Sequence, residues 1–418
     1  MHRLNISFIP DPSGNMSSTQ FPQLLLLLRL FILIECILRR TCKEWKELQL
    51  SLTQENLSRA LSSVGRIVSG RTSLPVLSNV LLATDTNRLR LSATNLEIGI
   101  NYWINSKVEG EGSLTVPARL FTEFVSSLPQ GNIELTGSDT TLTVKTPHYE
   151  SKINGISAEE FPLIPQIKSE PLIRISTQVF KDALSQVVVA ASADESRPVL
   201  AGIYLYIEEQ QLVIVATDSY RLAEKRVEVE EGTKQFSVIV PARTMQELVR
   251  LLSESDGDVE LYIDENQVLF RMDDIELVSR LIEGAFPNYQ QIIPKSAETS
   301  LEISTAEFAR IVKVASLFAR ESAGSVKVEI KTEGQIQIIS SDAEVGGNTS
   351  SAECEVSGED GEISLNAKYL ADALSVIKAP RVQFSINGKL NPCVLMPVEK
   401  EGEDACDDYL HIVMPLRT

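Results

Sequence analysis

Hydrophobic and polar positions follow two alternating periods along this chain. Leu48, Leu50 and Leu52 are apolar at every second position, which predicts a half-buried strand. After Thr53, a plausible N-cap, apolar residues recur every three or four positions, and this spacing predicts a helix at 54–68.

A second helix and several short strands complete the pattern. Pro117 suits the first turn of a helix at 118–128, whose predicted buried face is Leu120, Phe121, Phe124, Val125 and Leu128. Short alternating segments predict strands at 80–84, 88–93, 133–136, 141–146 and 152–156, with one more ending at Val116. Two helices with seven or eight strands predict an α+β domain with mostly antiparallel pairing.

The same pattern returns twice, after about 125 residues each time. Val116-Pro117-Ala118-Arg119 is repeated as Val240-Pro241-Ala242-Arg243 and, in diverged form, as Leu365-Asn366-Ala367-Lys368. Further helices are predicted at 177–192, 242–252, 305–320 and 367–378. A period of this length is one small domain. We therefore expect three tandem copies, at 48–166, 167–295 and 296–418.

Residues 1–47 do not match the repeat. Their apolar run, from Leu24 to Ile34, is interrupted by Arg29 and is shorter than the roughly 20 residues that cross a bilayer. It also lacks the cleavage site of a signal peptide. We expect a poorly ordered extension or an upstream stretch added by a misassigned start, with the codon of Leu48 as one possible initiator. A membrane anchor is the alternative.

Composition restricts the chemistry. The chain is 43% hydrophobic and 23% charged, as in an ordinary packed protein. Its five cysteines form no CxxC pair and its three histidines are isolated, so we expect no metal, no cofactor and a reducing compartment. The net charge of −18 argues against nucleic acid when only the total is considered.

The distribution of charge changes this conclusion. The six helical segments carry eleven Lys or Arg and six Asp or Glu, whereas the chain as a whole is strongly acidic. Three basic pairs are spaced seven apart, on one helix face each: Arg59 with Arg66, Arg243 with Arg250, and Lys313 with Arg320. Solvated helix faces are one explanation. The other is a basic surface that binds phosphate backbones without reading their sequence.

Four motifs carry a family resemblance over about residues 48–418. They are Gly70–Leu77, Val215–Leu222, Gly284–Tyr289 and Val413–Arg417, and they resemble the beta subunit of bacterial DNA polymerase III, the sliding clamp family. The resemblance implies a non-catalytic subunit with three clamp domains, and a head-to-tail homodimer that closes a six-domain ring. Helices would line its hole, through which double-stranded DNA passes.

The resemblance also implies two sets of site residues. A pocket for partner peptides would use Leu200, Thr217, Ser219, Tyr220, Arg221, Leu222, Pro287, Gln291, Ile292, Asn366, Tyr369, Leu390, Pro392, Val413, Met414, Pro415, Leu416 and Arg417. DNA would be faced by Arg59, Arg66, Arg71, Arg119, Arg197, Arg243, Arg250, Arg310, Lys313, Arg320 and Lys368.

Some of these assignments have alternatives. Ser219-Tyr220 stands where some family members have Gly-His, and Gln291 stands where a basic residue can occur, so the peptide preference is open. Leu222, Ile292 and Val413 could instead be core residues. Arg71 and Arg197 could be solvated loop residues.

The resemblance implies several partners in the bacterial cytoplasm and nucleoid, and no membrane. They are the polymerase III alpha subunit, the clamp loader, a 3′–5′ exonuclease complex, repair proteins and other carriers of the clamp-binding motif. Two alternatives are a clamp-like scaffold without DNA binding and a carboxylate-based hydrolase. The best candidate acids for a hydrolase are Asp218 and Asp342, which occupy equivalent strand ends.

Overall fold

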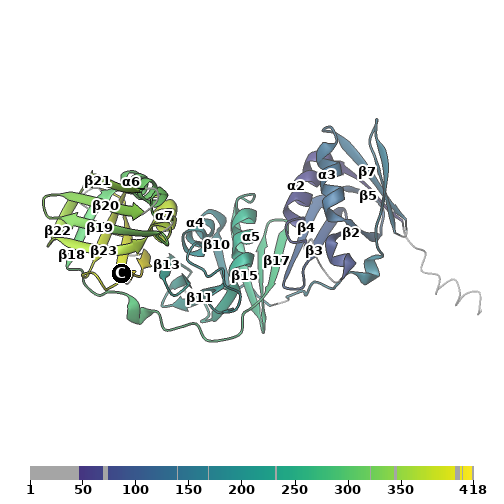
Figure 1. Ribbon diagram of the computed structural model, residues 1–418. Coiled ribbons are helices and arrows are strands. Elements are labelled where there is room, and N and C mark those ends of the chain that lie inside the picture. Colours follow the sequence, from purple (N-terminus) through teal and green to yellow (C-terminus); the bar gives the residue numbers. More distant parts are fainter. Residues whose placement is uncertain are drawn as a thin grey trace, which may run out of the picture. The chain divides into compact units, whose positions relative to one another are not determined.

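The computed structural model describes residues 47–68, 74–138, 140–167, 169–230, 233–320, 322–342, 346–400, 405–406 and 408–416. Nearly all of the predicted extension, together with Arg71 and Arg417, lies outside the described residues. From Leu48 onward the same order of elements occurs three times (Figure 1).

The first domain has α2 (Gln54–Val64) and α3 (Ala118–Ser127). Its strands are β1 (Leu48–Thr53), β2 (Asn79–Asp85), β3 (Arg88–Thr94), β4 (Ile98–Asn105), β5 (Lys107–Gly110), β6 (Ser113–Pro117), β7 (Asn132–Ser138), β8 (Thr141–Lys145) and β9 (Glu150–Asn154).

The second domain has α4 (Thr177–Val188) and α5 (Ala242–Leu252). Its strands are β10 (Ile173–Ser176), β11 (Gly202–Glu208), β12 (Gln211–Thr217), β13 (Arg221–Glu228), β14 (Ser237–Pro241), β15 (Asp258–Asp264), β16 (Gln267–Met272) and β17 (Ile275–Arg280).

The third domain has α6 (Thr305–Leu317) and α7 (Ala367–Val376). Its strands are β18 (Thr299–Ser304), β19 (Ser325–Lys331), β20 (Gln335–Asp342), β21 (Gly346–Glu353), β22 (Glu355–Gly358), β23 (Gly361–Asn366), β24 (Arg381–Ile386), β25 (Cys393–Val398) and β26 (Tyr409–Val413). Short 3-10 turns occur at Pro75–Ser78, Ala158–Glu160 and Gln290–Ile292.

These elements confirm the α+β class and the six helices, all of which start at the predicted residues. Within the described residues the first and third domains have nine strands each, one more than predicted, because β5 and β22 are short edge strands. Five of the six helices end one to four residues earlier than predicted. Arg66, Arg320 and Lys378 therefore lie in the segments that follow α2, α6 and α7.

The first helices share one way of starting. Thr53 occupies the predicted N-cap position, but its side chain makes no capping hydrogen bond. Instead the first backbone N–H of the helix donates to a carbonyl in the loop after the second helix of the same domain. The pairs are Gln54 N to Gly131 O (2.8 Å), Thr177 N to Gly257 O (2.8 Å) and Thr305 N to Pro380 O (3.0 Å). This contact satisfies an N–H that the helix itself cannot and ties the two helix layers together.

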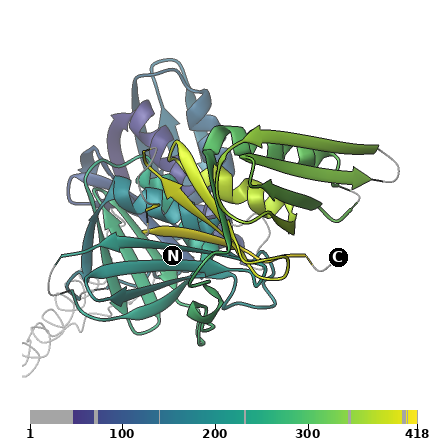
Figure 2. The same cartoon turned by 90° about the vertical axis from the view of Figure 1, so that its left-hand side faces the viewer.

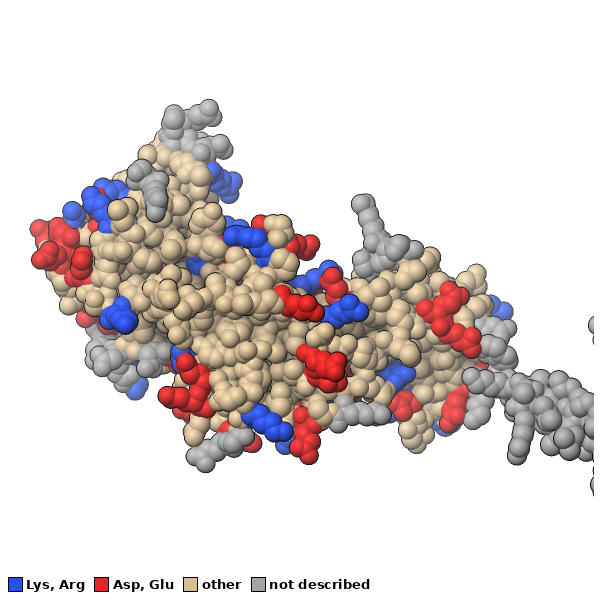
Figure 3. Space-filling view, turned by 90° about the horizontal axis from the view of Figure 1, so that it is seen from below, with Lys and Arg blue, Asp and Glu red and all other residues tan. Residues whose placement is uncertain are grey.

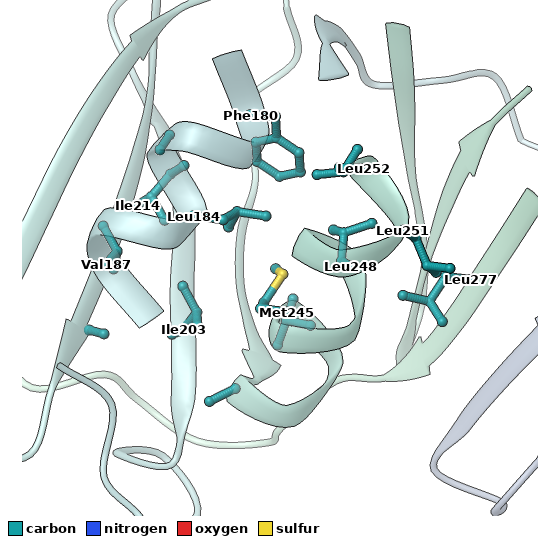
Figure 4. Packing of buried hydrophobic residues seen from close by; sticks show 14 of the residues in the cluster. Phe180, Leu184, Val187, Ile203, Ile214, Met245, Leu248, Leu251, Leu252 and Leu277 are labelled. Carbon is teal, nitrogen blue, oxygen red and sulfur yellow. The ribbon is translucent and has the colours of Figure 1, made fainter. Parts of the chain in front are cut away.

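The core of each domain lies between its helix pair and the sheets. In the second domain, Phe180 and Leu184 of α4 face Met245 and Leu248 of α5, and none of these side chains is more than 1% exposed (Figure 4). Burial of each such side chain stabilises the fold by about 1.5–3 kcal/mol. One predicted core residue is wrong: Leu120 of α3 is 54% exposed, because no described part of the chain covers its side of the helix.

Two of the four sheets continue from one domain into the next. The eight-stranded sheet has the order β10-β15-β16-β17-β4-β3-β2-β6, and the nine-stranded sheet has the order β14-β11-β12-β13-β26-β25-β24-β18-β22. The joining pairs are β4 with β17 (labelled in Figure 1) and β13 with β26; in Figure 2 the yellow strands of the third domain lie beside the teal strands of the second. We call these two pairings the first and the second joint.

Both joints have the same register. A residue near the end of β4 or β13 donates its N–H to the carbonyl of the residue just before the partner strand. These bonds are Trp103 N to Asp274 O (2.9 Å) and Arg226 N to Asp408 O (2.7 Å). The five-stranded sheet, β5-β1-β7-β8-β9, and the four-stranded sheet, β21-β20-β19-β23, each lie within one domain. Their edge strands β9 and β21 occupy the positions that form the joints elsewhere.

A buried histidine lies in the second joint. His411 of β26 is 0% exposed, sits opposite Ala223 of β13, and has its Nδ1 3.0 Å from the hydroxyl of Tyr409. Its Nε2 has no hydrogen-bond partner in the described part of the protein. Burial, and then the charge of Arg221, lower the pKa of His411 to about 3.

We expect His411 to make the fold acid-sensitive. The unfolded chain binds a proton near pH 6.5, whereas the folded chain binds it only near pH 3, so stability is full above pH 6.5 and falls between the two values. At pH 5.5 the loss in unfolding free energy should be about 1.4 kcal/mol. Urea unfolding of wild type and His411→Gln at pH 7.5 and 5.5 measures it.

The exposed His148 provides the matched control. His148→Gln should keep the wild-type difference between the two pH values, and His411→Gln should lose most of it. An unchanged difference in His411→Gln would contradict the assignment.

Candidate partner-peptide and DNA-binding sites

The predicted pocket is built around a tight turn between β12 and β13. The hydroxyl of Thr217 donates to Arg221 O (2.6 Å) and accepts from Ser219 N (3.1 Å). A carboxylate oxygen of Asp218 accepts from the backbone N–H groups of Tyr220 and Arg221, each at 2.9 Å. Ser219 has a φ of +79°. The side chains thus hold the turn in a fixed shape and leave Tyr220 58% exposed.

Arg221 connects this turn to the third domain. Its guanidinium is 3.0 Å from Asp218 and 2.6 Å from Asp372 of α7, and it lies 4.6 Å from the ring centre of Tyr369. The rings of Tyr220 and Tyr369 stack with centroids 6.5 Å apart. Arg221 is 9% exposed, and two carboxylates and a π face compensate its buried charge. Asp218 is therefore engaged in the turn and an ion pair, which does not suit the general acid or base of a hydrolase.

The last described residues complete the same region. Val413 lies opposite Arg221 on one side and Cys393 on the other. Beyond the strand, Met414 N donates to Tyr220 O and Leu416 N donates to Ser364 O, both at 2.8 Å. The tail therefore runs from the turn of the second domain to β23 of the third, with Met414, Pro415 and Leu416 half-buried.

A large open cavity adjoins the tail. It has a volume of about 1310 Å³, and of the predicted pocket residues it is lined by Leu390, Met414, Pro415 and Leu416. Leu390 is 75% exposed and gives the cavity an apolar edge. Lys327 and Lys389 lie on the polar side and both pair with Glu362. The cavity has both the apolar surface and the polar rim that peptide recognition needs.

The linker between the second and third domains packs against the outer face of the nine-stranded sheet. The ring of Phe286 stacks on Tyr204 with centroids 4.9 Å apart. Tyr289 belongs to one apolar cluster with Leu222 and Ile412. The hydroxyl of Tyr289 donates to the buried carboxylate of Glu224, and burial, followed by this bond, raises the pKa of Tyr289. Pro287, Gln291 and Ile292 lie along this anchored linker.

Several predicted pocket residues have mainly structural surroundings. Leu222 and Val413 are 0% exposed and Thr217 is 5% exposed, so they form the floor beneath the site. Asn366 caps α7 by accepting from Lys368 N (2.9 Å). Leu200 accepts a backbone hydrogen bond from Ser192 in a loop, and Pro392 directly precedes Cys393, opposite the tail.

One predicted DNA-facing residue lies beside the pocket. The guanidinium of Arg197 is 3.4 Å from both Ser219 Oγ and Asp218 O.

Three residues of this region were not predicted from the sequence: Asp372, Glu224 and Tyr204. Asp372 is 151 residues from Arg221 along the chain, and no local pattern signals their pairing.

The other described residues that were predicted to face DNA are all exposed. Arg66 lies 4.0 Å from Glu254, Arg119 lies 2.9 Å from Glu123, and Arg250 pairs with Glu247. In the described part of the chain, no carboxylate pairs with Arg59, Arg243, Arg310, Lys313, Arg320 or Lys368. Figure 3 shows a face on which basic and acidic side chains are interspersed with uncharged surface. These six cations all lie on or next to the helices.

Two further features bear on the chemistry. The described residues contain no group of three or more His, Cys, Asp or Glu that could hold a metal ion. None of the described helices combines the length and the apolar character that a membrane span requires.

The family models of the DNA polymerase III beta subunit match three successive parts of the chain. The N-terminal domain model matches residues 48–165, the central domain model 174–288 and the C-terminal domain model 290–417. The beta sliding clamp of Staphylococcus epidermidis is 30% identical over 382 residues, which cover 89% of this chain and 100% of the relative.

Solved structures give the same result. The sliding clamp of Bacillus subtilis is 28% identical with a TM-score of 0.83, and the beta subunit of Thermotoga maritima is 25% identical with a TM-score of 0.81. Each comparison covers 89% of this chain and 100% of the other. The chain therefore belongs to the DNA polymerase III beta subunit family, whose members are non-catalytic DNA sliding clamps.

Proposed function

We propose that two copies of this clamp, each with domains at 48–166, 167–295 and 296–418, join head to tail into a ring around double-stranded DNA. The observation that carries the proposal is the repeated joint between domains. At each joint, the last strand of one domain pairs with the fourth strand of the preceding domain. These pairs are β17 with β4 and β26 with β13. A third joint of this kind needs the last strand of the first domain, β9, and the third domain's equivalent of β4, which is β21.

Both strands required for the third joint are at sheet edges in the described part of the chain. An unpaired edge is a site for pairing with another chain. Pairing β9 of one subunit with β21 of the partner subunit removes both edges. Because the contact is head to tail, a second identical joint closes the ring.

Side chains near these edges support the same contact. The tenth residue of the first helix touches the next domain at both existing joints: Ser63 Oγ donates to Glu254 (2.8 Å), and the carbonyl of Gln186 accepts from Tyr409 (3.4 Å). The equivalent residue of α6 is Val314, which is 38% exposed, and Leu317 one turn later is 54% exposed.

The exposed Leu120 lies on the first domain, which would form the other side of the third joint together with β9. It is the third residue of α3, and the third residue of α7 is Tyr369, whose ring contacts Arg221 across the second joint. Leu120 would then be covered by the partner subunit, which accounts for an apolar residue left open on a single chain.

DNA inside the ring would meet the cations on and next to the helices. Arg243, Arg310, Lys313 and Lys368 are exposed and have no carboxylate partner in the described part. They would contact phosphates without reading bases. Enclosure prevents escape, so each contact stays weak and the ring slides. The polymerase, the clamp loader and other clamp-binding proteins would dock through short peptides between the second and third domains, in the compartment that holds the bacterial chromosome.

We expect Leu317→Glu to split the dimer. A charge buried at the third joint loses hydration without gaining a partner, so the dissociation constant should rise at least about a hundredfold. Sedimentation equilibrium of the full chain would then give the monomer mass of 46.2 kDa at micromolar concentration.

Val179 of α4 is the matched control, since it is 47% exposed and belongs to the second domain, which takes no part in the third joint. Val179→Glu should keep the wild-type mass. A wild type that is strictly monomeric at micromolar concentration would contradict the ring.

We expect Arg243→Ala and Arg310→Ala together to weaken the hold on DNA, because two guanidinium groups no longer reach the phosphates. On nicked circular DNA, the slope of log retention against log salt should fall by about 0.9 for each phosphate that is left without its cation. Linear DNA should release both proteins quickly from its ends.

Arg174→Ala removes an exposed arginine that is paired with Glu260 on strands of the eight-stranded sheet, and it should leave the slope unchanged. If wild type dissociates from circular and linear DNA at the same rate, the protein is a scaffold that does not encircle DNA.

We expect Met414→Ala to weaken binding of a peptide from the polymerase III alpha subunit about tenfold, because this substitution removes a half-buried side chain from the cavity edge. Fluorescence anisotropy with the labelled peptide measures the change. Val179→Ala should bind like wild type. If Met414→Ala and wild type bind equally, the pocket lies elsewhere.

A further inference from the structure

We propose that the first joint carries a second, smaller docking site for an extended peptide of another protein, with one aliphatic side chain followed by a carboxylate. The proposal rests on the peptide pocket proposed for the second joint, because the two places are built alike. A pocket of about 110 Å³ lies at the first joint, between the β3–β4 turn, the linker after Phe161 and the ends of β16 and β17.

The turns at the two joints have the same hydrogen bonds. Thr94 Oγ1 donates to Ile98 O (2.9 Å) and accepts from Leu96 N (3.0 Å), as Thr217 does in its own turn. Asn95 Oδ1 accepts from Glu97 N and Ile98 N, as Asp218 does from its neighbours. The φ of Leu96 is +76°, against +79° at Ser219.

The rest of the pocket also corresponds position by position. Arg280 N donates to Glu97 O (3.0 Å), where Met414 N donates to Tyr220 O (2.8 Å). Phe161-Pro162 repeats as Phe286-Pro287 at the start of the next linker. Eight of the twelve lining residues at the first joint can therefore be matched with predicted pocket residues: Thr94, Leu96, Glu97, Ile98, Gly99, Pro162, Gln267 and Arg280 with Thr217, Ser219, Tyr220, Arg221, Leu222, Pro287, Pro392 and Met414.

The differences between the joints define what this pocket holds. Its volume is close to that of cavities that hold one benzene-sized group, about 150 Å³. Leu163 is 96% exposed and Leu96 is 47% exposed at its edge. Leucine is disfavoured at positive φ, so the turn presents an apolar side chain here despite a conformational cost. These features fit one aliphatic side chain of a peptide rather than a whole hydrophobic motif.

The charge at the pocket selects the neighbouring residue of that peptide. Arg280 is exposed and stands where the second joint has Met414, and within the described residues no carboxylate pairs with its guanidinium. A carboxylate next to the aliphatic side chain complements this cation. Glu97, on the same edge, disfavours a second acidic group there.

A photo-crosslinking experiment on the full chain tests the proposal. The probe is the synthetic peptide acetyl-Gly-Ser-Xaa-Asp-Gly-amide, in which Xaa is photo-leucine, and labelled residues are found by mass spectrometry. We expect saturable labelling within residues 94–99 and 162–165. Leu163→Asp should lower it at least about tenfold and Arg280→Glu about fivefold, while Met414→Ala should leave it unchanged. A probe with Lys in place of Asp should label these residues about fivefold less.

The outcomes separate this inference from the proposed function. If the probe labels residues near Met414 and Leu416 but not residues 94–99 and 162–165, the site at the first joint is overturned. The peptide pocket at the second joint is then unaffected. Two results together would support the site at the first joint and overturn the peptide pocket. They are labelling at 94–99 and 162–165 that persists in Met414→Ala, and unchanged binding of the alpha-subunit peptide by that variant. If neither Leu163→Asp nor Arg280→Glu reduces the labelling, the site at the first joint is overturned.

Discussion

The backbone pairing between the last strand of each domain and the domain before it is the interaction on which the structure depends. Without it, β17 and β26 would each present an unpaired edge, and the domains would be held only by their linkers and by side-chain contacts. The pairing uses main-chain groups, so side chains at equivalent positions were free to diverge. Gly99 and Leu222, or Arg280 and Met414, therefore occupy matching places with different chemistry.

The charge distribution is consistent with a ring built from such joints. A chain with a net charge of −18 repels DNA at long range, and this repulsion limits non-specific binding to its outer surfaces. In the proposed ring, attraction would come from the cations on and near the helices, which make few ion pairs within the described residues. Such contacts are individually weak and screened by salt. They suit a protein that holds DNA by enclosure, because strong contacts would prevent sliding.

The sequence predicted the repeat and the helix starts because hydrophobic periodicity and the Pro117 and Pro241 signals are local. Properties that depend on distant contacts were not predictable. Leu120 has the spacing of a core residue but faces away from its own domain. The turn at Thr217–Leu222 was identified from its motif, whereas the pairing of Arg221 with Asp372 depends on how two domains meet. The contact of Arg197 with Ser219 likewise depends on how a loop folds back on the turn.

The proposed joint between subunits differs from the two internal joints for a physical reason. The internal joints connect covalently linked domains, and a linker raises the effective concentration of the two faces to the millimolar range. Polar contacts such as Ser63 with Glu254 and Arg221 with Asp372 are then sufficient. Two separate subunits instead lose translational and rotational freedom, at a cost of roughly 4–15 kcal/mol. Buried apolar area can offset that cost, and Leu120, Val314 and Leu317 provide it at the faces where the linker is absent.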